Sequence, residues 1–387
     1  MKRGIWEEFD GYKEIIGEVE ATRKYRENIV PVKYETAPYV ERLHPAKLDL
    51  RIVDIIEESP STKTLRLVSG DHYLPPFMAG QYITLYPTIG NIRTGRPYSI
   101  SSSPNQIGYY DITVRRVENG LVSNYLLDEV KVGDVLESSG PAGNFHFNPI
   151  VHEKTMVCIA GGSGITPFMS MIREIVESGL DRTVYLFYGS KNTEDIIFDE
   201  ELAEISKRFP RIIYTPVIEE PSDDFAGEKG FISGNLVSNV SGDHDNKTYF
   251  LCGPRGLYDF CLPELKGQGI PARRIRQEMF GPPVNIDTYP GWPSTVTGDD
   301  AFTVSVKGKK SFQAQAGESL LTSLEKNGII IPSLCRSGEC SMCRVKILSG
   351  TVYQPPGTMV RKSDREWGFV HSCVSYPIED LEILTVT

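Results

Sequence analysis

The sequence predicts a multidomain protein of the α/β and β classes, with an antiparallel barrel, a parallel α/β domain and a smaller third domain in that order. Its 387 residues exceed what one hydrophobic core usually organises, and this length predicts about two to three domains. The hydrophobic pattern also changes near residue 150, from short alternating stretches to apolar strands separated by helical stretches. A group of four cysteines near the C-terminus indicates a further, separate unit.

The first two folded domains are predicted from their strand patterns. Residues 48–150 contain short alternating stretches at 50–55, 64–68, 82–86 and 110–114, separated by turn residues, as in a small antiparallel barrel. Residues 151–283 alternate apolar strands, at 156–160, 184–188 and 249–252, with helical stretches such as 167–178. Such alternation is typical of a parallel sheet covered by helices.

The remaining segments are an extension, a linker and a last domain. Residues 1–47 form an N-terminal extension in which apolar residues from Ile5 to Val19 recur at three- and four-residue steps, as in an amphipathic helix. That helix would pack on the same protein or, alternatively, bind a partner. Pro31, Pro38 and Pro45 are expected to keep the following chain extended. Residues 284–298, rich in Pro and Gly, predict a semi-rigid linker to a last domain at 299–387.

Composition excludes several classes of function. The net charge of −10 makes non-specific binding to nucleic acid an unnatural interpretation. No apolar run reaches the roughly 18 residues that predict a membrane span, and acidic residues stand where a signal peptide needs its apolar stretch. Cys158, Cys252 and Cys261 are odd in number, which suits a reducing compartment better than a disulfide framework. A cytoplasmic location is therefore expected.

Four cysteines carry the most specific spacing in the chain. Cys335, Cys340 and Cys343 follow a C-x4-C-x2-C pattern, and Cys373 stands after a long gap. This is the spacing of a plant-type 2Fe–2S ligand set. A zinc site, which prefers paired C-x2-C knuckles, and disulfides fit the spacing less well. The four cysteines are therefore predicted metal ligands, and the chain is predicted to move electrons.

Two stretches in the first domain have the chemistry of a flavin site. Arg96, Pro97, Tyr98 and Ser99 end a strand, and they combine a cation for a phosphate, a flat ring for an isoalloxazine and a hydroxyl that can reach the flavin N5 edge. Taken alone, this stretch fits an ordinary strand equally well. A second stretch, with Gly120, Val122 and Ser123, resembles a known flavin-site motif in which a glycine and a serine at a helix N-terminus hold a pyrophosphate.

A glycine-rich stretch in the second domain has the chemistry of a dinucleotide site. Gly161, Gly162, Gly164 and Thr166 form a glycine-rich turn between a strand and a helix, where backbone N–H groups can approach a phosphate. Two further stretches follow later in the chain, namely Cys252, Gly253 and Pro254, and then the run 277–281 with Glu278 and Phe280. The alternatives, which are less favoured, are that Cys252 is a small buried hydrophobe and that Phe280 is a core residue.

These motifs resemble those of the ferredoxin–NADP reductase superfamily, and the resemblance covers residues 48–387. The order of flavin, nicotinamide and plant-type ferredoxin resembles the reductase components of ring dioxygenases, monooxygenases and O-demethylases. It implies an FAD-binding barrel, an NAD(P)-binding domain and a C-terminal β-grasp ferredoxin domain. It also implies that Cys252 lies beside the hydride transfer, that Phe280 covers the flavin face and that Ser99 and Glu278 serve N5. Because FMN has no pyrophosphate for Ser123 to hold, FAD is favoured over FMN.

The implied function is electron transfer from NAD(P)H through flavin and a 2Fe–2S cluster to a partner such as an oxygenase or demethylase component. NADH is favoured over NADPH because Lys191 is a single base against Glu194 and Asp195 in the stretch that would meet a 2′-phosphate. An electron-transfer subunit docked in a larger complex is the alternative. A redox sensor is disfavoured, because a sensor has no need of a nicotinamide site. Arg336 and Arg344 are expected to meet an acidic face of the acceptor, or Arg336 to bond within its own loop.

Overall fold

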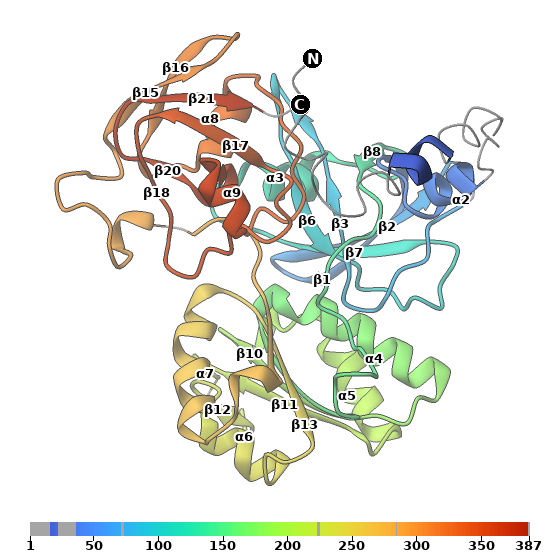
Figure 1. Ribbon diagram of the computed structural model, residues 1–387. Coiled ribbons are helices and arrows are strands. Elements are labelled where there is room, and N and C mark those ends of the chain that lie inside the picture. Colours follow the sequence, from blue (N-terminus) through green and yellow to red (C-terminus); the bar gives the residue numbers. More distant parts are fainter. Residues whose placement is uncertain (1–15, 22–35, 71–72, 223–224, 284, 386–387) are drawn as a thin grey trace, which may run out of the picture. The chain divides into compact units, whose positions relative to one another are not determined.

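The computed structural model describes residues 16–21, 36–70, 73–222, 225–283 and 285–385, which form two units divided between Pro45 and Ala46 (Figure 1). Within the first unit, residues 16–21 are helical and α2 spans Thr36–Leu43. Most of the predicted amphipathic helix lies outside the described residues. The expectation of an extended chain at Pro38 is wrong, because Pro38 lies in the first turn of α2, where a proline costs no intrahelical hydrogen bond.

The second unit begins with a six-stranded antiparallel sheet. Its strands follow the order β6-β3-β8-β1-β2-β7, and the edge strands approach each other through a bridge between Ile100 and Ile112. This closure confirms the predicted barrel. Alternate side chains fill its interior, for example Leu50 and Ile52 of β1. The strands are β1 (Leu48–Ser59), β2 (Thr62–Ser69), β3 (Tyr82–Leu85), β6 (Arg96–Ser99), β7 (Tyr110–Arg115) and β8 (Val135–Ser138).

Two smaller elements accompany the barrel. The hairpin of β4 (Thr88–Ile89) and β5 (Ile92–Arg93) leads into β6, and α3 (Leu121–Asn124) continues as one π-helical turn, Tyr125–Glu129. Val122, Leu126 and Leu127 from that helical stretch are buried in the barrel core.

A parallel sheet follows, as predicted. Its order is β12-β11-β10-β9-β13-β14, so the chain moves outward in one direction from β9 and then returns to the other side of it. The carboxyl ends of β9 and β13 therefore meet at the switch point where parallel sheets bind their ligands. The strands are β9 (Thr155–Gly161), β10 (Thr183–Ser190), β11 (Ile212–Ile218), β12 (Glu228–Lys229), β13 (Lys247–Cys252) and β14 (Ile275–Glu278).

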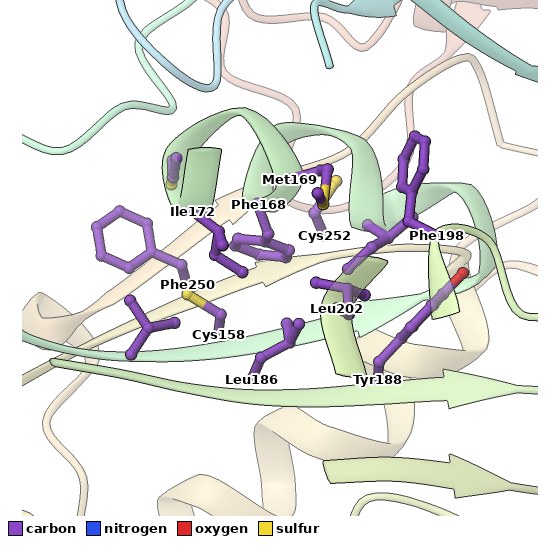
Figure 2. Close-up of a cluster of buried hydrophobic side chains, with 14 of the residues drawn as sticks. Cys158, Phe168, Met169, Ile172, Leu186, Tyr188, Phe198, Leu202, Phe250 and Cys252 are labelled. Atoms are coloured by element: carbon purple, nitrogen blue, oxygen red, sulfur yellow. The ribbon is translucent and has the colours of Figure 1, made fainter. Parts of the chain in front are cut away.

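Helices cover both faces of this sheet. Phe168, Met169 and Ile172 of α4 (Thr166–Ser178) pack on strand residues that include Cys158, Leu186 and Phe250, as Figure 2 shows. Leu202 of α5 (Asp199–Arg208) belongs to the same cluster. On the other face, Val237 of α6 (Gly234–Ser241) and Leu265 of α7 (Arg255–Gly267) pack on the remaining strand residues. Short 3-10 turns lie at Gly162–Ile165, Thr193–Asp195 and Ala272–Arg274.

The last domain is a mixed five-stranded sheet in the order β16-β15-β21-β17-β19, with β15 and β21 parallel and the other pairs antiparallel. Leu320, Leu321 and Leu324 of α8 (Leu320–Lys326) pack into its core. The strands of this sheet are β15 (Ala301–Val306), β16 (Ser311–Gln315), β17 (Arg344–Ser349), β19 (Phe369–His371) and β21 (Leu381–Thr385). A separate short pair is formed by β18 (Val352–Tyr353) and β20 (Tyr376–Pro377). The domain also contains α9 (Lys362–Glu366) and a 3-10 turn at Ser372–Val374, and another 3-10 turn, Ile286–Thr288, precedes it.

The segment predicted as a linker packs on this last domain. The Trp292 ring lies 5.0 Å from Tyr353 and 6.5 Å from Tyr376, measured between centroids, in edge-to-face geometry. The Trp292 indole N–H also donates to the Val296 carbonyl at 2.6 Å. The described part of the segment is therefore fixed by aromatic packing. In the described ranges, no helix combines the length and apolar character that crossing a membrane requires.

Candidate active site

One cavity of about 1220 Å³ is lined by most of the predicted dinucleotide residues and by part of the cysteine loop, but not by the predicted flavin stretches, Glu278 or the four cysteines themselves. Its walls come from the turn after β9, the ends of β13 and β14, the barrel residues Arg115 and Val117, and the loop between the first two cysteines of the four. The sequence-predicted residues that line it are Gly161, Gly162, Gly164, Lys191, Cys252, Gly253, Pro254 and Phe280. Thr166 does not line the cavity. Its hydroxyl donates to the Ser163 carbonyl at 3.0 Å.

Steric demands explain the glycines at the turn after β9. A side chain at Gly164 would overlap the Cys252 carbonyl group, so the turn can approach β13 only without a Cβ atom. Gly162 has a φ of +52°, in the left-handed region, and a Cβ there would overlap the Arg115 guanidinium. Arg115 pairs with Asp195 and so brings the barrel to the glycine turn. Sequence reasoning missed Arg115 because its role depends on contacts between two domains.

The β13 and β14 ends form the cavity floor. Cys252 is fully buried, and burial raises the pKa of its thiol well above the usual value. Tyr258 accepts a hydrogen bond from the Gly253 N–H at 3.2 Å and donates to the Glu278 carbonyl, so it braces both strand ends. Tyr258 was not predicted from sequence, where it is one of many aromatic residues at helical spacing.

Glu278 and Phe280 sit beside Tyr82 of β3. Burial raises the pKa of Glu278 well above its usual range, with Glu339 and then Cys335 adding to the effect. Its Oε2 atom is buried and has no hydrogen-bond partner among the described residues. The Phe280 side chain is 37% exposed and meets Tyr82 edge-on at 6.1 Å, so Phe280 is not a core residue.

The predicted flavin stretch 96–99 contains polar groups that could bind a cofactor. Arg96 donates to the Thr94 hydroxyl and the Gly95 carbonyl, both at 2.7 Å, and has no ion-pair partner within the described ranges. Burial, and then Arg336, lower the pKa of Arg96 to about 10. The Ser99 hydroxyl is buried and, like Glu278 Oε2, lacks a partner in the described part of the chain. A phosphate for Arg96 and a flavin ring edge for Ser99 would satisfy these groups, so the residues fit the cofactor. Pro97 and Tyr98 are half-buried in the same strand.

The second flavin stretch has a close-packed backbone. Ser123 Oγ accepts the Val117 N–H at 3.1 Å, and a Cβ at Gly120 would lie 2.5 Å from that oxygen. Among the residues that the structure describes, no acceptor takes the Ser123 hydroxyl proton, so a pyrophosphate could accept it. Val122 is buried in the barrel core, so its side chain packs against apolar residues.

One part of the cavity wall carries both a basic and an acidic side chain. Lys191 and Glu219 both line it, and the Lys191 ammonium lies 3.7 Å from the Glu220 carboxylate. Both partners of that pair are more than half exposed, so the pair is weak. Phe231 and Phe260 also line the cavity and face each other, with ring centroids 5.3 Å apart.

The four cysteines form two pairs. Cys335 pairs with Cys340 and Cys343 with Cys373, each through a hydrogen bond between thiol groups. The hydrogen bond from the Cys340 thiol is the largest of the effects that lower the pKa of Cys335 to about 4, and the Ser337 and Cys340 N–H groups also donate to its sulfur at 3.4 and 3.3 Å. Two thiolates for each of two irons is the arrangement that a 2Fe–2S cluster needs. Because the cysteines lie in pairs, the described ranges contain no group of three or more His, Cys, Asp or Glu side chains around a single metal position.

The loop around these cysteines has an unusual backbone. Arg336, Gly338 and Ser341 all have positive φ, so successive N–H groups turn toward one side of the loop, as in an anion-binding nest. His371 Nδ1 donates to the Gly338 carbonyl at 2.7 Å, and the Ser372 hydroxyl donates to the Cys343 carbonyl at 2.7 Å. These two residues, which sequence reasoning missed, tie the loop to the segment that carries Cys373.

The expectation that Arg336 meets an acceptor is wrong. Arg336 is 1% exposed and forms a bidentate ion pair with Glu325 of α8, at 2.7 and 3.0 Å. Its partner lies outside its own loop, so the second interpretation of Arg336 is wrong as well. Arg344 is partly exposed and pairs with Asp364 at 3.0 Å.

Three family models match the chain in order. They describe an oxidoreductase FAD-binding domain at residues 49–147, an oxidoreductase NAD-binding domain at 158–262 and a 2Fe–2S iron–sulfur cluster binding domain at 304–377. Among relatives, NADH oxidoreductase HCR of Escherichia coli is 31% identical over 336 residues, which are 86% of this chain and 96% of the relative. The glycine betaine monooxygenase reductase subunit of Chromohalobacter salexigens is 28% identical over 342 residues, covering 85% and 93%.

Solved structures agree with these relatives. Phthalate dioxygenase reductase matches with a TM-score of 0.64 and 25% identity, over 88% of this chain and 98% of that structure. An Amycolatopsis cytochrome P450 reductase matches with a TM-score of 0.55 and 27% identity, over 61% and 70%. The chain therefore belongs to the ferredoxin–NADP reductase superfamily, among the flavin and nicotinamide oxidoreductases that carry a C-terminal plant-type 2Fe–2S ferredoxin domain.

Proposed function

We propose that this protein is the reductase component of an oxygenase system, taking electrons from NADH and delivering them through FAD and a 2Fe–2S cluster to a partner oxygenase. The observation that carries the proposal is the single cavity whose wall includes the glycine turn, Phe280 and residues Ser337–Glu339 of the cluster loop. Relatives named as reductase components of monooxygenases support the choice of partner.

When bound, the flavin accepts a hydride from the nicotinamide and passes electrons singly to the cluster. The protein's own residues prepare that exchange. Ser99 holds a hydroxyl ready for the flavin N5 edge, and the buried Glu278 carboxyl, whose pKa is raised, can exchange a proton near it. Phe280 covers the position of the nicotinamide ring until the dinucleotide arrives, because its ring is partly exposed and contacts Tyr82 edge-on.

The four cysteines are the proposed cluster ligands, and Arg96, Gly120 and Ser123 are proposed to hold the FAD phosphates. Gly161, Gly162 and Gly164 admit the dinucleotide phosphates. The pairing of Lys191 with Glu220, next to Glu219, favours NADH, since a 2′-phosphate would meet two carboxylates there. All seven cysteines are free thiols, and this supports a reducing compartment such as the cytoplasm.

The test begins with the purified holoprotein. Extraction should yield one FAD per chain, and anaerobic mixing with NADH should bleach the flavin and then the cluster absorbance. Cys373→Ser should abolish cluster absorbance and its electron paramagnetic resonance signal while flavin reduction by NADH persists.

Cys261→Ala is the matched control, because Cys261 is a buried thiol that belongs to neither cysteine pair. It should retain both cofactors. A parent protein whose cluster stays oxidised after NADH has reduced the flavin would defeat the proposed function.

A further inference from the structure

Barrel side chains hold the iron–sulfur domain at the base of its cluster loop. The Tyr86 hydroxyl donates to the Ser333 carbonyl at 2.8 Å, and the Thr84 hydroxyl donates to the Leu334 carbonyl at 3.2 Å. These two carbonyl groups belong to the two residues that precede Cys335 in the chain. The contact between the domains is therefore made at the segment that positions a cluster ligand.

Glu325 is the charged centre of this contact. Its carboxylate is buried, accepts two bonds from the Arg336 guanidinium and accepts a third from the Thr94 hydroxyl at 2.8 Å. Arg336 follows Cys335 in the cluster loop, whereas Thr94 belongs to the barrel. One carboxylate therefore joins the loop of one domain to the wall of the other.

The same chain of bonds reaches the flavin stretch. Thr94 donates its only hydroxyl proton to Glu325 and accepts a bond from Arg96 at 2.7 Å. The hydrogen bonds therefore connect Arg96 to Thr94 and Thr94 to Glu325. Arg336 bonds to the same Glu325 carboxylate from within the iron–sulfur domain. Three of these four residues are less than one tenth exposed, and charge-assisted bonds of this kind fix geometry as well as adding energy.

A buried ion pair contributes little net stability compared with apolar residues of the same shape, because both charges are removed from water. The directional bonds to Glu325 do, however, determine which arrangement of the two domains is satisfied. The ion pair with Arg336 lies within the iron–sulfur domain, whereas the bond from Thr94 crosses from the barrel. A seating that broke the Thr94 bond would leave the buried Glu325 carboxylate without one of its donors, at a free-energy cost.

We propose that Glu325 is a positioning residue that sets the cluster loop against the flavin barrel, so that electrons pass rapidly between the two cofactors. The inference rests on the proposed function. Reaction rates depend steeply on the placement of reacting groups, and a shift of about 1 Å can cost about a hundredfold. A carboxylate shared by both domains is suited to prevent such a shift.

The test uses the holoprotein with Glu325→Gln, which keeps the side-chain shape but removes the charge and one acceptor. In anaerobic stopped-flow with NADH, flavin bleaching should keep its parental rate, whereas the following cluster bleaching should slow about tenfold or more. Cluster content should stay at the parental level. Hydrogen exchange should increase in residues 93–97 and 319–327 and stay unchanged in the parallel sheet.

Two further variants separate positioning from folding. Glu318→Gln is the matched control, since Glu318 pairs with Lys326 at 2.5 Å and with Ser323 at 3.1 Å inside the iron–sulfur domain. It should leave both phases unchanged. Thr94→Val breaks the chain from the barrel side and should slow the cluster phase relative to the flavin phase. The double variant with Glu325→Gln should be no slower than the slower single variant, because both remove one connection.

Parental cluster-phase rates in Glu325→Gln and Thr94→Val would overturn the inference while leaving the proposed function intact. Equal slowing of both phases would also overturn it, because the chain of bonds would then act on the flavin site and not between cofactors. Loss of the cluster in Glu325→Gln together with a parental rate in Thr94→Val would assign Glu325 to domain folding alone. A parent without any NADH-driven cluster reduction would instead refute the proposed function itself.

Discussion

Gly164 packs against the backbone of Cys252 so closely that any side chain at position 164 would overlap the Cys252 carbonyl group. The contact joins the glycine turn after β9 to the end of β13, and therefore fixes the two walls of the dinucleotide cavity relative to each other. Because the obstacle is backbone and not a flexible side chain, a larger residue must displace one of the strands.

Gly164→Ala should therefore raise the KM for NADH at least about tenfold and lower the free energy of unfolding by roughly 1–3 kcal/mol, as overpacking does. Steady-state kinetics and denaturant titration measure the two effects. Gly267→Ala is the control, since a Cβ there meets nothing within 4 Å. Unchanged NADH kinetics in Gly164→Ala would contradict the assignment of this contact to the nucleotide site.

Ser99→Ala tests whether the buried hydroxyl serves the flavin. Since the hydroxyl has no partner within the described ranges, its removal should not destabilise the cofactor-free protein, but it should slow flavin reduction about tenfold, the value of one hydrogen bond. Stopped-flow and thermal unfolding measure this. Ser101→Ala should do the reverse and cost about 1 kcal/mol, because Ser101 bonds to the Asp111 carbonyl and to Thr113. A parental rate of flavin reduction in Ser99→Ala would remove Ser99 from the site.

Phe280→Ala should change the KM for NADH and the preference over NADPH while lowering the free energy of unfolding by less than about 1 kcal/mol, since the ring is partly exposed. Phe250→Ala, in the core shown in Figure 2, should cost about 3–5 kcal/mol without altering coenzyme preference. Kinetics with both coenzymes and denaturant titration compare the two variants. A destabilisation of Phe280→Ala that matched Phe250→Ala would mean that Phe280 is structural.

His152 should contribute a pH dependence of stability. Burial, followed by the charge of Arg276 and by His146, lowers the pKa of His152 to about 4 from an ordinary value of 6.5. Between these values the unfolded chain binds a proton that the folded chain does not, so stability should fall as pH falls from 6.5 toward 4. His152→Gln should flatten that slope, measured by urea titration at a series of pH values. An identical slope in parent and variant would assign the acid sensitivity to other groups.

The fold class and the positions of the motifs were predictable from the sequence because they depend on local requirements. Alternating residues of β1 and β2 have to face a barrel interior on one side, and a turn that approaches a carbonyl group as Gly164 does excludes every Cβ. The C-x4-C-x2-C spacing reflects the reach of one loop around a cluster. The roles assigned to Ser99, Glu278 and Phe280 stay predictions, although the structure places their side chains where such roles are possible.

Contacts between distant segments decided the rest. From the sequence, Arg336 beside Cys335 is expected to be an exposed charge. It is buried instead, because Glu325 on α8 pairs with it and Thr94 of the barrel donates a further bond to Glu325. Arg115 and Tyr82 carry no local signal either, and each acquires its place only when the barrel meets the parallel-sheet domain. Tyr258 of α7 acquires its place within one domain, where it bonds to the ends of β13 and β14. Periodicity and spacing describe what one segment of chain demands of its surroundings. Which groups are desolvated, and which partner compensates each of them, depends on segments up to hundreds of residues away, and tertiary structure alone brings these together.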